Sequence, residues 1–301
     1  MSDCKETRSY DISNVSVGNR FRFGIACGNE VTSETDPVSL SYKNGVMHHL
    51  GDLLDLAVQV LRPGDRVLDL GAHIGGFALA ASAMGCEVIA MEASPRNAEL
   101  IKISAVHNDF KKLEILNAAV NDKKTELDFC VAGPWGTVAN PVMTQQFESI
   151  SIPALRVDDV LSERGWNKVD FIKLDVEGSE VRALQGMSRL LKKPDAPIIY
   201  FESNTHTLGL FGEDHHKLKG LLRDAGYHLY KKSPSGLEQV SAEDEQQETC
   251  VDYIASKDPS IVLHDFSTQP PDSKQSCERS GWLRHNLKTW RQWIRSWRRS
   301  K

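Results

Sequence analysis

A buried strand that runs into a glycine-rich bend and then a helix constrains this chain more than any other feature. The strand contains Val67, the bend contains Gly71 and Gly75, and helical periodicity follows over Gly76–Met84. Glycines let a backbone bend sharply and approach a ligand closely, and the first turn of a helix presents free N–H groups. The bend therefore predicts a ligand site at the end of a strand.

Apolar segments with strand and helix periodicity alternate over most of the chain. Parallel strands need long crossovers, so this alternation predicts an α/β fold, a doubly wound, mostly parallel seven-stranded sheet with helices on both faces. Two further strands, Glu126–Val131 and Ser149–Leu155, are expected as an insertion before the fourth core strand. The core strands are expected at Arg66–Leu70, Glu87–Met91, Leu113–Leu116, Val169–Leu174, Ile198–Phe201, Tyr227–Tyr230 and Cys250–Ala255.

Four regions are expected along the chain. Residues 1–45 contain short strand-like pieces and are interpreted as a leader or cap, and residues 46–257 as the α/β domain. Residues 258–280, rich in Asp, Ser, Pro and Gln, are interpreted as a linker. Residues 281–301 are predicted to form a basic amphipathic helix.

Bulk properties favour a cytoplasmic protein. The amino terminus is polar and no apolar run is long enough for a membrane span. The six cysteines show no CxxC spacing, which argues against a zinc site or a redox pair. The net charge is −5, although residues 281–301 contain seven Lys or Arg residues and no acid. The acidic remainder makes nucleic acid an unexpected partner.

The carboxyl-terminal segment combines apolar and cationic faces. Leu283, Leu287, Trp290, Ile294 and Trp297 recur at helical spacing, with Arg or Lys at much of the rest. Such a helix is typical of peripheral contact with a membrane surface. Docking on the acidic body of the same or a partner subunit, and an unconstrained tail, are the alternatives. The oligomeric state is left open.

The residues of the bend indicate which ligand it holds. The position two after Gly71 is His73, which departs from the GxGxxG pattern of dinucleotide sites, and no lysine follows Gly76 as a P-loop requires. Asp69 would repel a pyrophosphate. It suits a ligand with an amino group and a sulfonium, which are both present in S-adenosylmethionine.

Two more strand ends extend this site. Glu92 closes the second strand, where its carboxylate can accept both hydroxyls of a ribose, and Asn117 and Ala118 follow the third strand, where they can meet an adenine. Open α/β sheets bind ligands at the carboxyl ends of their strands. The predicted cofactor-binding residues are therefore Asp69, Gly71, His73, Gly75, Glu92, Asn117 and Ala118.

The run from Asp170 to Glu180, with its pattern KxDxEGxE, is the most specific motif in the chain. Together with the glycine bend, Ile89–Pro95 and Asn117–Asp122, it resembles the FkbM family of methyltransferases over roughly Leu61–Ala255. The resemblance implies the class I methyltransferase (Rossmann-like) sheet with an antiparallel last strand. It also implies O-methylation, commonly of a sugar or secondary-metabolite hydroxyl. His73 departs from the asparagine that is common in the family.

Candidate catalytic residues lie at the ends of the fourth and fifth strands. Asp175 is expected beside the methyl donor as general base or substrate anchor, with Glu177 two residues later and Lys173 paired to one of them. His206, after the fifth strand, is a further candidate base. The alternative is a purely structural network of acids and lysine.

The sequence leaves a metal site and the class of acceptor open. Asp175, Glu202 and Asn204 could hold Mg²⁺, although no spacing demands a metal and none is assigned. The acceptor is expected to be a small molecule or glycan. The alternatives are an N- or protein methyltransferase and a non-catalytic module that keeps the fold.

Overall fold

The computed structural model describes residues 10–258, except 19, 30–35, 48–49, 132–135, 141–143, 145–146, 234–235 and 242–248. Apart from Asp258, the predicted linker and the carboxyl-terminal helix lie outside the described residues. None of the helices within those limits is both long and apolar enough to cross a bilayer.

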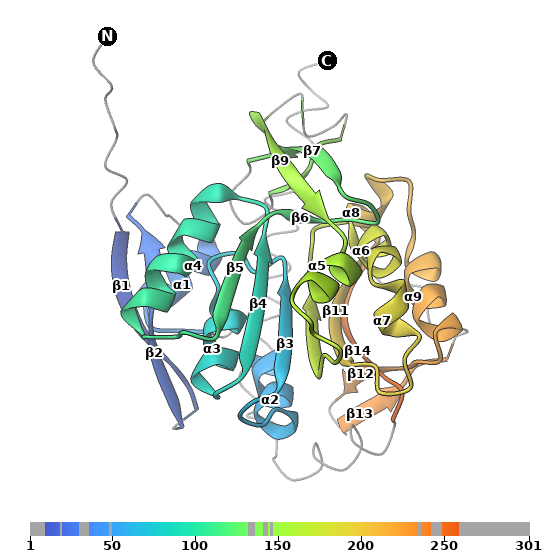
Figure 1. Cartoon of the computed structure of the whole chain (residues 1–301), viewed down its shortest axis with the longest axis horizontal. Coiled ribbons are helices and arrows are strands. Elements are labelled where there is room, and N and C mark those ends of the chain that lie inside the picture. The colour runs from blue at the N-terminus through green and yellow to red at the C-terminus, as the bar shows by residue number, and fades with distance from the viewer. Residues whose placement is uncertain are drawn as a thin grey trace.

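An eight-stranded sheet forms the centre of the molecule, with the order β13-β12-β14-β11-β10-β3-β4-β5 (Figure 1). β14 runs antiparallel to both β11 and β12, whereas β11, β10, β3, β4 and β5 are mutually parallel. The predicted fold class and antiparallel last strand are confirmed, and β13 adds an eighth strand as a hairpin with β12. The bounds are β3 Arg66–Leu70, β4 Glu87–Glu92, β5 Leu113–Asn117, β10 Phe171–Leu174, β11 Ile198–Asn204, β12 His228–Ser233, β13 Gly236–Gln239 and β14 Cys250–Ser256.

Helices cover both faces of this sheet because successive strand residues point to opposite sides. Val67 and Phe171 face one core with α2, α3 and α4, while Leu68 and Ile172 face the other with α5, α6, α7, α8 and α9. The first layer is α2 Gly51–Val60, α3 Gly76–Ala83 and α4 Pro95–His107. The second is α5 Val157–Glu163, α6 Glu180–Gly186, α7 Ser188–Leu191, α8 Thr205–Gly209 and α9 His215–Asp224.

The amino-terminal segment is a hairpin, β1 (Tyr10–Val17) and β2 (Phe21–Gly28), followed by α1 (Pro37–Lys43). The hairpin lies outside α4 (Figure 1), and its β2 strand is tied there by a hydrogen bond from the Ala26 amide to Ser104 Oγ at 2.8 Å. Ile25 is fully buried in the same core as α3. The segment interpreted as a leader or cap thus covers the first helical layer.

A second sheet of four short strands, in the order β6-β9-β7-β8, lies beyond the carboxyl ends of β4 and β5 (Figure 1). It contains the two strands expected as an insertion, which are observed as β7 and β9. We call it the inserted sheet. Its strands are β6 Ala119–Val120, β7 Thr125–Cys130, β8 Thr137–Val138 and β9 Ser149–Leu155.

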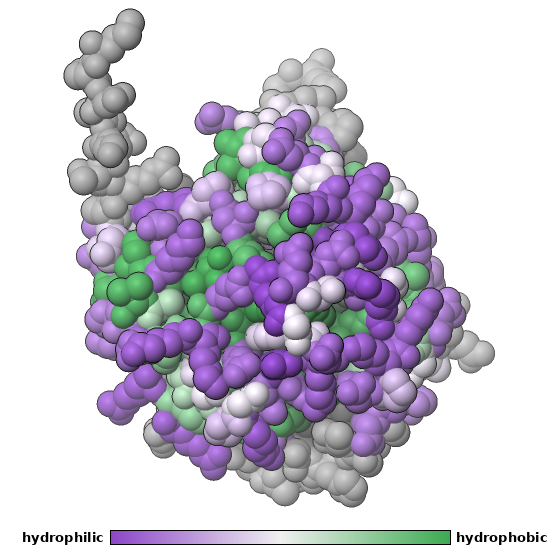
Figure 2. Space-filling model, viewed as in Figure 1, coloured by the Kyte–Doolittle hydropathy of each residue, from purple (hydrophilic) through white to green (hydrophobic). Residues whose placement is uncertain are grey.

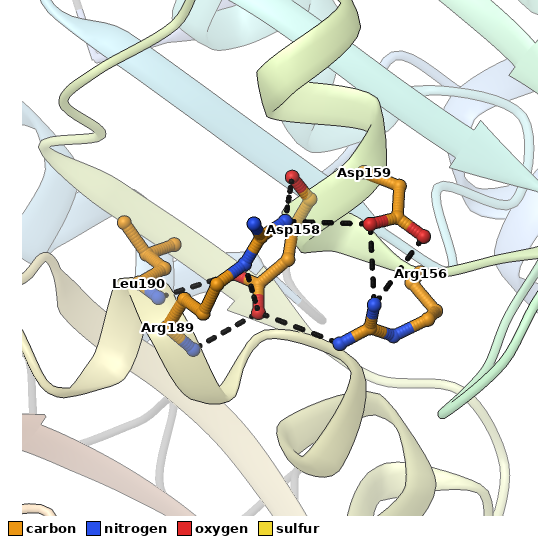
Figure 3. A network of polar contacts seen from close by, with 5 residues as sticks. All are labelled: Arg156, Asp158, Asp159, Arg189 and Leu190. Carbon is orange, nitrogen blue, oxygen red and sulfur yellow. Dashed lines mark hydrogen bonds and ion pairs between the residues drawn. The ribbon is translucent and has the colours of Figure 1, made fainter.

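A polar network joins α5 to α7 in the second helical layer (Figure 3). The buried Asp158 carboxylate accepts hydrogen bonds from the backbone amides of Arg189 at 2.9 Å and Leu190 at 3.1 Å. The Arg156 guanidinium reaches both Asp158 and Asp159. Since the first amides of a helix have no intrahelical partner, Asp158 stabilises the start of α7.

Figure 2 shows a mostly hydrophilic surface on the face of the molecule seen in Figure 1, with apolar side chains gathered on the side of β1 and α4.

Candidate functional site

A cavity of about 630 Å³, including space open to solvent, lies at the carboxyl ends of the parallel strands. Its walls come from the glycine bend after β3, the ends of β4 and β5, the turn after β10, and the inserted sheet. The lining residues are Gly71, His73, Met91, Glu92, Ala93, Asn97, Ala118, Ala119, Val120, Phe129, Gly136, Thr137, Val138, Asp175, Val176, Glu177 and Ser179.

The glycine bend is built so that only glycine fits at its first position. Gly71 has a φ of +79°, and a Cβ atom there would lie 1.8 Å from the carbonyl oxygen of Asp175. Gly75, with a φ of +92°, caps the start of α3. His73 lies between them with a φ of +53°, a conformation uncommon for residues other than glycine. The bend therefore packs directly against the turn after β10.

Asp69 lies behind the bend and is fully buried. Its Oδ2 atom accepts a hydrogen bond from the Ala78 amide at 2.9 Å, and its Oδ1 atom lies 3.7 Å from Lys173 Nζ. Burial raises the pKa of Asp69, and Lys173 opposes this rise. Asp69 is not among the lining residues, so the structure places it beneath the cavity wall, where it fixes α3 and Lys173. Direct contact of Asp69 with a cofactor remains a prediction.

Glu92 is buried and lines the cavity at the end of β4. Its two carboxylate oxygens accept the backbone amides of His73 and Ser94, both at 2.8 Å. Burial raises the pKa of Glu92, and these two hydrogen bonds oppose the rise. An ionised carboxylate has about four acceptor sites, so two N–H donors leave room for ligand hydroxyls.

The end of β5 contributes backbone and small side chains. Asn117 Nδ2 donates to the carbonyl oxygens of Glu92 and Ala93, both at 2.9 Å, and is not among the lining residues. Ala118 and Ala119 do line the cavity. Asn117 thus orients the turn after Glu92, and contact of Asn117 or Ala118 with a cofactor stays a prediction.

Lys173 connects the two sides of the site from within β10. Its Nζ atom donates to the carbonyl oxygen of Gly71 at 2.6 Å and lies 3.2 Å from Asp175 Oδ2. Burial alone would lower the pKa of Lys173, but Asp175 and Asp69 outweigh it and raise that pKa above its ordinary value. The side chain of Asp175 is 40% exposed and lines the cavity. Lys173 therefore stays a cation that holds Asp175 in place.

The remaining residues of KxDxEGxE shape the turn after β10. Glu177, with a φ of +52°, lines the cavity, and its carbonyl oxygen accepts a hydrogen bond from Thr137 Oγ1 of the inserted sheet at 2.8 Å. Burial, followed by Glu202 and Asp175, raises the pKa of Glu177 well above its ordinary value. Glu180 Oε1 accepts the amides of Val176 and Gly178, both at 3.1 Å.

The other predicted groups lie apart from the cavity wall. His206 is exposed in α8 and is not a lining residue; burial of part of its ring lowers its pKa. Asn204 Oδ1 accepts the amides of His206 and Thr207 and so caps α8. Glu202 is half-buried and accepts a bond from Cys250 Sγ; burial raises the pKa of Glu202 to about 8.

No group of three or more His, Cys, Asp or Glu side chains within the described ranges is arranged to hold a metal ion.

Several residues that line the cavity were not predicted as site residues. Phe129, Thr137 and Val138 come from the inserted sheet, and Ser179 comes from the start of α6. Only the alternating pattern of the two inserted strands pointed to that region.

The charges on the wall suit S-adenosylmethionine. Glu92, Asp175 and Glu177 line the cavity, and none of the described lining residues is a lysine or an arginine. A diphosphate would be repelled here, whereas a sulfonium and an ammonium group would be attracted. That Glu92 holds the ribose, with the Gly71–Gly75 bend along the amino-acid part of the molecule, stays a prediction.

Comparison with known proteins places the chain in a family. Residues 69–229 match the model of the methyltransferase FkbM domain. No protein with a curated description matches.

Several solved structures, all distant in sequence, resemble this chain. The precorrin-6y C5,15-methyltransferase of Geobacter metallireducens is 13% identical, with a TM-score of 0.41 over 69% of this chain and 87% of that one. A SAM-dependent methyltransferase of Agrobacterium tumefaciens is 13% identical, with a TM-score of 0.42 over 84% and 71%. The fibrillarin of Aeropyrum pernix, solved with natively bound S-adenosyl-L-methionine, is 13% identical, with a TM-score of 0.38 over 68% and 74%. Because the FkbM match spans more than half of its length, the chain belongs to the FkbM family of S-adenosylmethionine-dependent methyltransferases.

Proposed function

We propose that this methyltransferase acts on a hydroxyl group of a sugar, glycan or secondary metabolite. The observation that supports the proposal is the position of the Asp175 carboxylate. It is partly exposed, lines the cavity and lies 3.2 Å from the buried Lys173 ammonium. An alcohol must lose its proton when it is methylated. Asp175 is placed to accept that proton at the end of β10, beside the glycine bend.

Positioning is expected to be the larger part of catalysis. S-adenosylmethionine, when bound, supplies a methyl group on a positively charged sulfur. Holding an acceptor oxygen in line with such a group can contribute about 7–11 kcal/mol, whereas a general base adds roughly 10²–10⁴-fold in rate. Asp175 would first orient the hydroxyl and then take its proton as the carbon–oxygen bond forms.

The other predicted catalytic residues receive different roles in this proposal. Lys173 is a positioning residue, because its ammonium group is already bound by Gly71, Asp69 and Asp175. Glu177 lines the cavity and, when protonated, would donate a hydrogen bond to the acceptor. His206 is the least favoured base because it lies outside the wall. Mg²⁺ is not part of the proposal.

An acceptor assay tests this function directly. The full chain would be incubated with labelled S-adenosylmethionine and matched pairs of acceptors, such as glucose with glucosamine and a phenol with an aniline, together with a lysine-containing peptide. The expected products are methyl ethers on hydroxyl oxygens, which glucosamine can also form, with no methylated nitrogen. Methylation of amines or peptides alone would contradict the proposal, and cofactor binding without transfer to any class of acceptor would favour the non-catalytic module.

We further propose that residues 281–301 contact the membrane surface peripherally. The support is the segment's seven cations and its apolar spacing, since each cation contributes roughly 1 kcal/mol near an anionic surface. Sedimentation with phosphatidylserine vesicles would compare the full chain with a chain ending at residue 280. Equal pelleting of both would contradict the proposal.

A further inference from the structure

A hydrogen bond links the cofactor bend to a residue that precedes the family match. His73 Nε2 lies 3.1 Å from Asp36 Oδ2, and the match to the FkbM domain begins only at residue 69. The His73 backbone amide donates to Glu92. The imidazole therefore connects the amino-terminal segment to the wall of the cavity.

Asp36 is held rigidly for this contact. It is buried at the start of α1, where its Oδ1 atom accepts the Ser39 amide at 2.8 Å and its Oδ2 atom accepts Ser39 Oγ at 2.6 Å. Burial would raise the pKa of Asp36, but hydrogen bonds from His73 and Ser39 outweigh it and lower that pKa. Asp36 is thus a fixed carboxylate, and a proton shared with it must sit on His73 Nε2.

The backbone does not explain why residue 73 is a histidine. Its φ of +53° lies in the left-handed region, which asparagine also adopts readily. The second ring nitrogen, Nδ1, has no hydrogen-bonding partner among the residues that the structure describes. When the ring carries two protons, Nδ1 is a free donor beside the cofactor bend.

The cavity otherwise presents an electrostatic problem. S-adenosylmethionine has a carboxylate on its amino-acid part, and the described lining residues include the carboxylates of Glu92 and Asp175 but no lysine or arginine. Like charges in a partly buried site repel strongly. An additional cationic donor on the wall would remove this repulsion, and the imidazolium of His73 is the described lining group that can supply one.

We infer that His73, oriented by Asp36, binds the carboxylate of S-adenosylmethionine through its Nδ1–H group. Asp36 is then a positioning residue for the cofactor, supplied from outside the matched domain. The inference rests on the cofactor assignment and is independent of the proposed acceptor.

Decarboxylated S-adenosylmethionine, which keeps the sulfonium and the amine, tests this anchor by isothermal titration of the full chain. The wild type is expected to bind it about 10- to 100-fold more weakly than S-adenosylmethionine, as for the loss of a charged hydrogen bond. Without an anchor, the analogue would bind equally well or more tightly, because the wall is acidic. His73→Asn is expected to reduce the discrimination to about threefold or less.

Asp36→Asn tests the positioning residue, and His107→Asn is the matched control. Asn still caps α1 but removes the charge that faces Nε2, so Asp36→Asn should also reduce the discrimination. His107 is exposed at the end of α4, and His107→Asn should leave both affinities unchanged. Equal weakening of both ligands in His73→Asn, as a merely structural role predicts, would overturn the inference. A wild type that binds neither ligand would instead refute the cofactor assignment itself.

Discussion

Two acidic side chains on different walls of the cavity, Glu92 and Asp175, are held in place by different kinds of partner. Glu92 at the end of β4 is buried, and both of its oxygens accept backbone amides; among the described residues, no lysine or arginine is paired with it. Asp175 at the end of β10 is 40% exposed and is held by the ammonium of Lys173. A carboxylate fixed by backbone donors suits binding of a constant ligand, whereas a partly exposed carboxylate beside a cation can exchange a proton with an acceptor. On the proposed function, this difference divides the cavity into a binding wall around Glu92 and a reacting wall around Asp175.

Asp175→Asn should have the largest effect. The amide keeps the shape of the side chain but cannot accept a proton, so kcat is expected to fall by roughly 10²–10⁴-fold. The Kd for S-adenosylmethionine should change by less than about threefold, because Asp175 belongs to the reacting wall. Steady-state kinetics and titration measure the two quantities separately. Glu99→Gln, on the exposed side of α4, is the matched control, and unchanged turnover in Asp175→Asn would remove Asp175 from the mechanism.

Lys173→Met should have the next largest effect, on stability. The substitution leaves the carboxylate of Asp69 buried without its cation, which typically costs about 3–5 kcal/mol of unfolding free energy. Lys168→Met is the control, because Lys168 pairs with Asp170 near the surface and such pairs contribute at most about 1 kcal/mol. Urea denaturation compares the three proteins. Equal midpoints for both variants would show that the reacting wall does not depend on the buried ammonium.

The pH dependence of stability should identify Glu180 beneath the reacting wall. Burial raises the pKa of Glu180 to about 7, so the folded chain binds a proton there that the unfolded chain has already lost. The unfolding free energy should therefore fall as the pH rises from about 4.5 to 7, by up to about 1.4 kcal/mol per unit. Glu180→Gln keeps the acceptor for Val176 and Gly178 and should make this slope shallower, while Glu177 and Glu202, whose pKa values burial also raises, keep the remainder. Denaturation of both proteins from pH 5 to 8 would reveal an unchanged slope if Glu180 were not the source.

The binding wall was largely predictable from the sequence because it consists of strand ends and short turns. Gly71, Glu92 and Ala118 each follow a recognisable strand, and all three line the cavity. KxDxEGxE likewise fixed the location of Asp175 and Glu177. In these places local chain geometry determines which residues meet.

Contacts between distant segments could not be predicted in the same way. Asp36 reaches His73 only because the amino-terminal hairpin packs on α4, and Thr137 reaches Glu177 only because the inserted sheet lies over the turn. Asp69 and Asn117 were expected to contact a ligand; the structure shows Asp69 Oδ2 and Asn117 Nδ2 bonded to the backbone, and ligand contact of the two residues stays a prediction. A polar side chain at a strand end can bond either a ligand or the backbone, and the packing of the folded chain determines which of these it reaches.

Glu92→Gln should have the smallest effect and the sharpest contrast with Asp175→Asn. The side-chain oxygen of the glutamine can still accept a hydrogen bond from one backbone amide. Its NH₂ group would face the other backbone amide, which is also a donor, and the negative charge is lost. The expected loss is about tenfold in affinity for S-adenosylmethionine, in line with the ~1.5–3 kcal/mol of a charged hydrogen bond. At saturating cofactor, kcat should stay within about threefold of the wild type, because this wall holds the ligand without taking part in proton transfer. If kcat fell as far in Glu92→Gln as in Asp175→Asn while affinity did not change, the two walls would not be functionally distinct, and their different hydrogen bonding would reflect folding alone.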